Sequence, residues 1–147
     1  MKKSILFVCI HNSARSQMAE AFVNRFAADR FIAESAGIEP SKLNPVVVEA
    51  MKEIGIDISA NKTKSVHDFI ATGKRFDYIV TVCDETSAER CPVFPGKGKR
   101  LHFGFADPSA LSGSFEEKLT KTRVIRDKIG STIKAWIKKL STNETQE

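Results

Sequence analysis

Cys9 and Arg15 are the two residues whose types and spacing point most directly to chemistry. They enclose the segment Ile10-His11-Asn12-Ser13-Ala14, which gives the pattern Cys-x5-Arg. A cysteine thiolate is a strong nucleophile, and the planar fork of an arginine binds two oxygens of a tetrahedral anion. The pattern therefore predicts a nucleophile inside an oxyanion-binding loop.

The segments on either side of this loop explain how it would be held. Ser4 to Val8 is a short apolar run typical of a buried strand, and residues 16–26 carry Met18, Phe22 and Phe26 at helical spacing. A loop between a strand and a helix N-terminus directs backbone N–H groups at one point, which favours an anion and keeps a nearby thiol ionised at neutral pH. The predicted oxyanion-binding residues are Ile10, His11, Asn12, Ser13, Ala14, Arg15 and Ser16. Beyond its place in the loop, His11 is expected to have no role as a base, because a thiolate needs none.

Length and composition restrict the classes of function. With 147 residues, the chain is long enough for one domain with a substantial core. A formal net charge of +5 suits anionic substrates and is too small to predict nucleic-acid binding. No stretch reaches membrane-spanning length, and no signal-peptide cleavage site follows the first apolar run. We therefore expect a monomeric, cytoplasmic protein in which three cysteines, an odd count, stay reduced for chemistry.

Strands and helices alternate along the chain. Beyond the first strand and helix, we expect strands at 30–37, 76–82 and 100–103, and helices at 45–54, 66–70 and 115–140. This alternation predicts a single three-layer α/β domain over residues 1–140, with a central four-stranded parallel sheet and helices on both faces. Residues 141–147 are expected to form a frayed polar tail.

Cys83 and Asp107 follow predicted strands, as Cys9 does. Ligands of parallel α/β folds bind beyond the carboxyl ends of the strands, so these three residues are expected to meet at one edge of the sheet. Pro108 favours an extended backbone at Asp107 and gives its carboxyl group a defined direction. A carboxylic acid facing an oxyanion site protonates a leaving oxygen.

Cys83 and Cys91 are too far apart in sequence for a Cys-x-x-Cys redox motif, and no partner pair is present for zinc. In a helix, their Cα atoms would lie roughly 12 Å apart, whereas a disulfide needs less than about 7 Å. A disulfide between them would therefore require the segment to unwind or bend, as in a redox switch. The alternative is that both cysteines only pack in the interior.

Together these segments resemble the arsenate reductases built on the low-molecular-weight protein tyrosine phosphatase fold, and the thioredoxin-coupled branch is the most similar. The resemblance covers nearly the whole chain. It rests on residues 9–20, Ser35-Ala36-Gly37, residues 83–92 and Asp107-Pro108. It implies arsenate as substrate, phosphate or sulfate as analogues, thioredoxin as partner, and no cofactor.

The resemblance also implies a role for each candidate residue. Cys9 attacks arsenate held by the loop and Arg15, while Asp107 helps water to leave. Cys83 then attacks the Cys9–arsenic adduct, which releases arsenite and leaves a Cys9–Cys83 disulfide. Cys91 attacks Cys83 and frees Cys9, and thioredoxin reduces the Cys83–Cys91 disulfide.

Some relatives bind potassium near the loop. Asn12, Glu20 and Ser35 match the residues that bind it, but Lys64 falls where those relatives have an aspartate. An ammonium group there would replace the cation. We therefore predict no metal, with a cation site near these residues as the alternative.

Two other functions stay open at this point. A phosphatase acting on phosphotyrosine or small phosphate esters needs only Cys9, Arg15 and Asp107. Ser109-Ala110 stands where such phosphatases have aromatic residues, and Tyr78 is the one tyrosine, so the walls that sandwich a phosphotyrosine ring are missing. The other alternative is a non-enzymatic, oxyanion-binding redox sensor. Glutaredoxin with glutathione is the alternative electron donor to thioredoxin.

Overall fold

The computed structural model describes residues 2–83 and 96–146, with side chains as far as residue 142. Four parallel strands form one sheet in the order β2-β1-β3-β4. The strands are β1 (Lys3–Cys9), β2 (Phe31–Gly37), β3 (Tyr78–Thr81) and β4 (Lys99–His102). The helices are α1 (Arg15–Phe26), α2 (Pro45–Lys52), α3 (Val66–Ala71) and α5 (Phe115–Gln146), and a 3₁₀ turn, η1, spans Pro108–Ala110.

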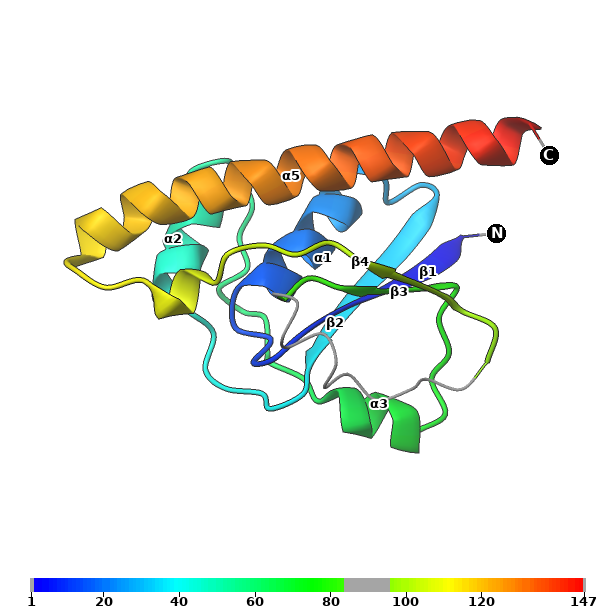
Figure 1. Ribbon diagram of the computed structural model, residues 1–147, viewed down its shortest axis with the longest axis horizontal. Coiled ribbons are helices and arrows are strands. Elements are labelled where there is room, and N and C mark those ends of the chain that lie inside the picture. The colour runs from blue at the N-terminus through cyan, green and yellow to red at the C-terminus, as the bar shows by residue number, and fades with distance from the viewer. Residues whose placement is uncertain (1, 84–95, 147) are drawn as a thin grey trace.

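Helices cover both faces of the sheet, as the alternating pattern predicted (Figure 1). Residues of α1, α2 and α5 pack on one face, and α3 packs on the other. Strand β1 supplies both cores, because Ile5 and Phe7 point to the first face while Leu6 and Val8 point to the second. This explains why β1 is a continuous apolar run rather than an alternating one. The three-layer α/β fold is therefore confirmed.

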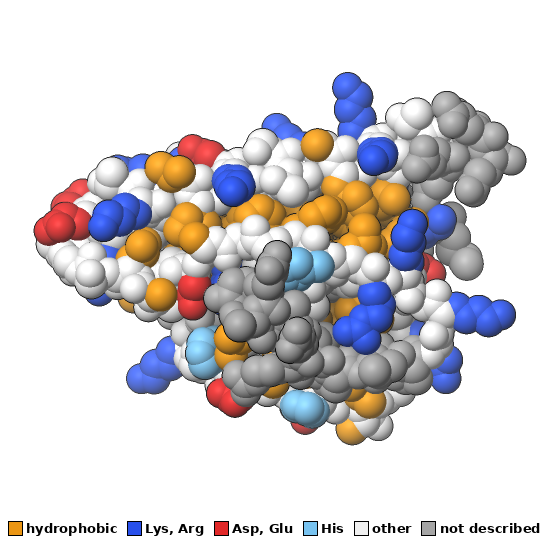
Figure 2. Space-filling model, viewed as in Figure 1, with side chains coloured by type: hydrophobic (Ala, Val, Ile, Leu, Met, Phe, Trp, Pro, Cys, Tyr) orange, Lys and Arg blue, Asp and Glu red, His pale blue; other side chains and the backbone are white. Residues whose placement is uncertain are grey.

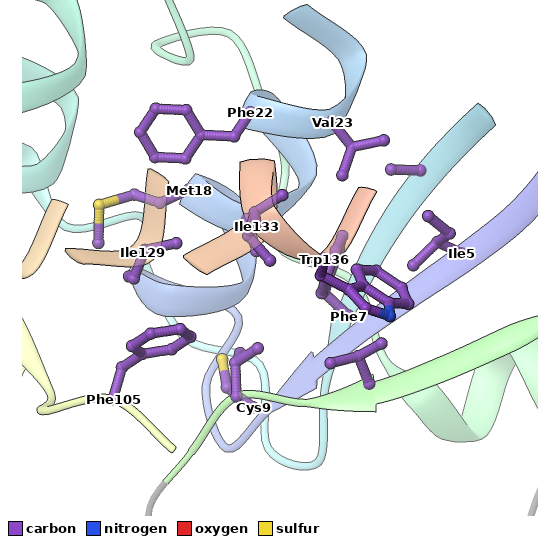
Figure 3. Packing of buried hydrophobic residues seen from close by; sticks show 14 of the residues in the cluster. Ile5, Phe7, Cys9, Met18, Phe22, Val23, Phe105, Ile129, Ile133 and Trp136 are labelled. Atoms are coloured by element: carbon purple, nitrogen blue, oxygen red, sulfur yellow. The ribbon is translucent and has the colours of Figure 1, made fainter. Parts of the chain in front are cut away.

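Trp136 of α5 forms the centre of an aromatic group against the sheet. Its ring makes edge-to-face contacts with Phe7, Tyr78 and Phe103, at centroid distances of 6.4, 5.6 and 5.7 Å. Figure 3 shows Trp136 beside Phe7, and Figure 2 shows apolar side chains along the underside of α5. Tyr78, the one tyrosine, thus belongs to the core packing and does not form a wall of the predicted site.

Helix α5 is longer than the sequence predicted. Its apolar stripe was expected to end at Leu140, whereas the helix continues to Gln146, so residues 141–146 of the predicted frayed tail are helical. No helix within residues 2–83 and 96–146 is long and apolar enough to cross a membrane.

Charged side chains fasten the end of α2 to α5. Arg123 and Arg126 both donate to the carboxylate of Glu53, and Arg126 Nη1 also donates to the carbonyl of Ala50 at 2.8 Å. The hydrogen bond from Arg123 lowers the pKa of the Glu53 carboxyl, and Arg126 acts in the same direction. These contacts hold α2, whose N-terminus borders the candidate site.

The order of the strands in the sheet determines where the candidate site lies. Strand β1 lies between β2 and β3, so the chain leaves β1 towards one side through α1 and later crosses to the other side. Such a switch point opens a crevice at the carboxyl end of the central strand, which here is Cys9. Segment 84–95, which contains Cys91 and the interval we considered as a helix, lies outside the described residues.

Candidate active site

The loop of residues 10–14 joins β1 to α1 and wraps around the Cys9 sulfur. The backbone N–H of Asn12 donates to Cys9 Sγ at 3.2 Å, and Ser16 Oγ lies 2.8 Å from the same sulfur. Because Ser16 Oγ also accepts from Asn12 Nδ2 at 2.7 Å, its hydroxyl proton is left to donate to Cys9. Two donors therefore converge on a buried sulfur.

Asn12 gives the loop its shape. Its φ of +54° is left-handed, a conformation that asparagine adopts more readily than most residues. The side chain is fully buried, and its Oδ1 accepts from Gln17 Nε2 at 3.1 Å and from the Lys64 backbone at 3.0 Å. These bonds hold the loop open around the sulfur before any anion arrives.

A second segment, residues 38–44, runs along the loop and fixes it from outside. Four backbone N–H groups donate to loop carbonyls: Ile38 to Cys9, Glu39 to Ile10, Ser41 to His11 and Asn44 to Ser13. His11 Nδ1 lies 2.9 Å from the carbonyl oxygen of Glu39, so it carries the proton and donates. His11 thus has a hydrogen-bond partner in the segment outside the loop.

The N-terminus of α1 is open towards the loop. Ala14 is its N-cap and makes no side-chain capping bond, so the first N–H groups of the helix are not blocked by a cap. Uncapped N–H groups and the helix dipole both favour an anion at this end.

Arg15, the first residue of α1, lies under the loop with 3% exposure. Its Nη1 donates to the Phe105 carbonyl at 3.2 Å, and its Nη2 lies 3.5 Å from Asp107 Oδ2. Its buried Nε–H has no hydrogen-bond partner among the described residues. A buried donor of this kind is satisfied by an oxygen of a bound anion.

Asp107 reaches the site from the loop before η1. Its side chain is 27% exposed, and its Oδ1 accepts from the backbone N–H of Ser109 at 3.0 Å. One carboxylate oxygen thus caps the turn while the other faces Arg15. The structure brings Asp107 to Arg15, at the carboxyl edge of the sheet where β1 ends.

Cys83 follows β3 on the strand next to Cys9. The N–H of Val82 donates to the Val8 carbonyl at 2.9 Å, which aligns the two strand ends. Cys9 and Cys83 are 2% and 1% exposed and belong to the same apolar cluster. Figure 3 shows Cys9 at the border of that cluster, beside Phe105.

The residues considered for a cation form a connected group. Lys64 Nζ lies 3.2 Å from Glu20 Oε1, and Ser35 Oγ donates to the same oxygen at 3.1 Å. The Lys64 backbone reaches Asn12, which links this ion pair to the loop. Within residues 2–83 and 96–146, no group of three or more acidic, histidine or cysteine side chains could hold a metal ion.

A cavity of about 290 Å³ opens beside the loop. It is lined by His11, Ser13, residues 41–46, Pro108, Ser109, Leu111 and Lys118. None of these described residues is Phe, Tyr or Trp, so this wall lacks the rings that would sandwich a phosphotyrosine. The sequence pattern did not indicate Asn44 and Ser109 as site residues, although Asn44 directly precedes the helix predicted to begin at residue 45.

Gly37, at the end of β2, packs directly on the backbone of the loop. A Cβ atom there would lie 2.8 Å from Asn12 N and from Ile10 O, and neither backbone group can move aside cheaply. We expect Gly37→Ala to lower the free energy of unfolding by about 1–3 kcal/mol, as measured by urea denaturation. Gly73→Asn is the control, because nothing lies near Gly73 and asparagine tolerates its positive φ. An unchanged unfolding midpoint for Gly37→Ala would contradict this packing.

The loop is expected to bind sulfate in the fully reduced protein. Sulfate at roughly ten times its Kd adds about 1.4 kcal/mol and raises Tm by about 3–6 °C. Chloride at equal ionic strength is the control for screening, and Arg15→Lys should weaken the shift because a lysine lacks the fork. No sulfate-specific shift at high millimolar concentration would show that the loop is not a preformed anion site.

A cysteine sulfur cradled at a strand-to-helix turn, with an arginine fork and a loop carboxylate beside it, defines the class of protein. Residues 4–146 match the family described as low molecular weight phosphotyrosine protein phosphatase, and the chain belongs to this family.

Its relatives include named reductases. The chain is 44% identical over 134 residues to the arsenate reductase of Bacillus subtilis strain 168, which covers 91% of this chain and 94% of the relative. A solved arsenate reductase in its oxidized state superposes with a TM-score of 0.77 at 28% identity, covering 93% of this chain and 98% of that one. A thioredoxin-dependent arsenate reductase from Corynebacterium glutamicum gives a TM-score of 0.59 at 26% identity, covering 91% of this chain and 63% of the other.

Proposed function

We propose that the chain reduces arsenate to arsenite through a relay of Cys9, Cys83 and Cys91. The observation that carries this proposal is the place of Cys83, a second buried thiol just beyond β3, the strand paired with β1, which ends at Cys9. Hydrolysis of a phosphate ester has no use for that thiol. A reductase needs one, because arsenic(V) takes up two electrons and a single thiol supplies only half of a disulfide.

The first half of the reaction uses the loop. Arsenate binds with its oxygens on the loop N–H groups, the α1 N-terminus and the Arg15 fork. The Cys9 thiolate forms a bond to arsenic, and an oxygen leaves as water with a proton from Asp107. The Cys9 sulfur accepts from Asn12 N–H, and attack by a thiolate requires no separate base.

The second half moves the electrons. The Cys83 thiolate attacks the Cys9 sulfur, a Cys9–Cys83 disulfide forms, and the sulfur–arsenic electron pair leaves with arsenite. The Cys91 thiolate then attacks Cys83 and displaces Cys9, which returns to its starting form. A Cys83–Cys91 disulfide remains. An external dithiol must reduce it before the next turnover.

Thioredoxin is the proposed donor of those electrons. The names of the relatives support the substrate and the donor: one is an arsenate reductase and another is a thioredoxin-dependent one. We propose a cytoplasmic location for the chain, because thiols persist in a reducing compartment. We also propose that it acts as a monomer and without a cofactor.

We propose further that Lys64 takes the place of a bound cation near the loop. Its ammonium lies on Glu20, and its backbone N–H holds Asn12. A fixed positive charge there compensates the partly buried carboxylate without a metal.

Hydrolysis of small phosphate esters is the second candidate function. Cys9, Arg15 and Asp107 are enough for it, and the family description names a phosphatase. The absence of Phe, Tyr or Trp among the described residues lining the cavity disfavours phosphotyrosine itself. A pure redox sensor is the least supported function, since a binder needs no nucleophile with a leaving-group acid beside it.

The test is arsenate-dependent NADPH consumption with thioredoxin and thioredoxin reductase, compared with glutathione and glutaredoxin. We expect steady turnover with thioredoxin and one arsenite released per NADPH oxidised. Turnover with glutaredoxin alone would overturn the donor. A protein that hydrolyses aryl phosphates but consumes no NADPH would be a phosphatase.

A further inference from the structure

We propose that Asn44 and Ser109 form a strap that positions Asp107 against the oxyanion-binding loop. The strap is the pair of hydrogen-bonded side chains Asn44 and Ser109. The inference rests on the proposed function, in which Asp107 delivers the proton to the leaving oxygen. It assigns a role to two residues that the mechanism has not yet used.

Ser109 connects Asp107 to the loop. Its backbone N–H donates to Asp107 Oδ1 at 3.0 Å, and its Oγ lies 3.4 Å from Ser13 Oγ. The same Oγ accepts from Asn44 Nδ2 at 3.0 Å. Ser109, which orients the Asp107 carboxylate, is thus held by both Ser13 and Asn44.

Asn44 gives the strap a rigid end. Its backbone N–H donates to the Ser13 carbonyl at 3.0 Å, and its Oδ1 accepts from Val46 N–H at 2.9 Å as the N-cap of α2. Its side-chain nitrogen remains free to donate to Ser109. An asparagine suits both tasks, because its amide offers an acceptor for the helix and a donor for the strap.

Asp107 needs the strap to hold its carboxyl group in place. Asp107 is part-exposed and stands before a 3₁₀ turn of three residues, which by itself gives little rigidity. Its contact with Arg15, at 3.5 Å, is longer than a well-formed charged hydrogen bond. A bound oxyanion competes for the same guanidinium, so the Arg15 contact weakens when the acid must act. The strap does not involve Arg15 and therefore remains.

Three substitutions separate the strap from its neighbours. Asn44→Ser keeps an N-cap for α2 but is too short to reach Ser109. Ser109→Ala removes the hydroxyl and keeps the backbone N–H that binds Asp107. Ser109→Thr keeps the hydroxyl and should restore the wild-type behaviour. Ser131→Ala is the control, because Ser131 makes a comparable exposed hydrogen bond on α5, to the Lys128 carbonyl.

Amide hydrogen exchange tests the strap without any activity. In the reduced protein, we expect the Ser109 amide to exchange about fivefold faster in Asn44→Ser and in Ser109→Ala, the size of one hydrogen bond of net ~1 kcal/mol. Ser109→Thr and Ser131→Ala should exchange like the wild type. An unchanged Ser109 amide in both strap variants would overturn the proposal.

Single-turnover arsenite release tests what the strap does. At saturating arsenate the rate should fall about fivefold in either strap variant, with the half-saturating arsenate concentration unchanged. The double variant should be no slower than Ser109→Ala, because that substitution already removes the bond from Asn44. In an Asp107→Asn background, neither substitution should slow the protein further. An equal slowing in that background would show that the strap does not act through Asp107.

Failure of the proposed function and failure of the strap would give different results. A wild-type protein that releases no arsenite would remove the proposed function, whereas the exchange measurement would still decide whether the strap holds Ser109. Normal arsenite release with unchanged exchange in the variants would leave the proposed function standing and remove the strap.

Discussion

Cys9→Ser is expected to abolish arsenate reduction and any hydrolysis of phosphate esters, each by at least about 10³-fold. The serine hydroxyl stays protonated in this loop, because the donors that stabilise a thiolate cannot ionise so weak an acid. Arsenite release and aryl phosphate hydrolysis, measured on the same preparation, check the result. Sulfate-dependent stabilisation should persist in this variant, which shows that the fold and the anion site remain.

Arg15→Lys is the companion variant and should cost about 10²–10³-fold in both activities. A lysine keeps the charge but lacks the fork that holds two oxygens. Arg25→Lys, at an exposed position on the same helix, is the matched control and should leave both activities unchanged. Near-normal turnover by Cys9→Ser or by Arg15→Lys would remove that residue from the site.

Replacing Cys83 or Cys91 with serine should stop multiple-turnover arsenate reduction while leaving hydrolysis of a small aryl phosphate largely intact. Hydrolysis needs the loop, its nucleophile and an acid. Reduction needs in addition a thiol relay that ends on a disulfide thioredoxin can reduce. Parallel assays of NADPH consumption and aryl phosphate hydrolysis measure both activities.

The two outcomes of that comparison are distinct. Loss of both activities in Cys83→Ser would indicate damage to the packing, since Cys83 is buried in the same apolar cluster as Cys9. Wild-type reduction rates in both variants would show that the relay is wrong.

The sequence predicted the fold and the edge of the sheet where the site lies. These follow from local patterns: an apolar run before Cys9, helical spacing at Met18 and Phe22, and strands that alternate with helices. The carboxyl ends of parallel strands share one edge, so the sequence pattern alone was enough to place Cys9 and Cys83 at the ends of neighbouring strands.

The sequence did not predict the groups that hold the site in shape. The left-handed turn at Asn12 depends on Gln17 and on the backbone of Lys64, 52 residues away. The bond from Asn44 to Ser109 joins residues 65 positions apart. Such contacts form only when the layers of the fold pack together, and the spacing of apolar residues in the sequence does not predict them. The position of the Tyr78 ring in the core is another feature that the sequence did not predict, because packing against Trp136 determines it.

The length of α5 was also not predicted from the apolar pattern of the sequence. The apolar stripe ends at Leu140, but the helix continues through polar residues to Gln146, and no Gly or Pro interrupts this extension. Residues 141–147 contain neither. The apolar pattern therefore marks where the core ends, and the helix extends beyond it.

The most direct test of the three-cysteine relay is mass spectrometry of Cys91→Ser after exposure to excess arsenate without thioredoxin. The relay predicts one arsenite released per protein and a stalled Cys9–Cys83 disulfide. In Cys83→Ser it predicts no arsenite and an arsenic adduct on Cys9. A Cys91→Ser protein that releases arsenite repeatedly, or that releases one equivalent without a Cys9–Cys83 disulfide, would contradict the relay.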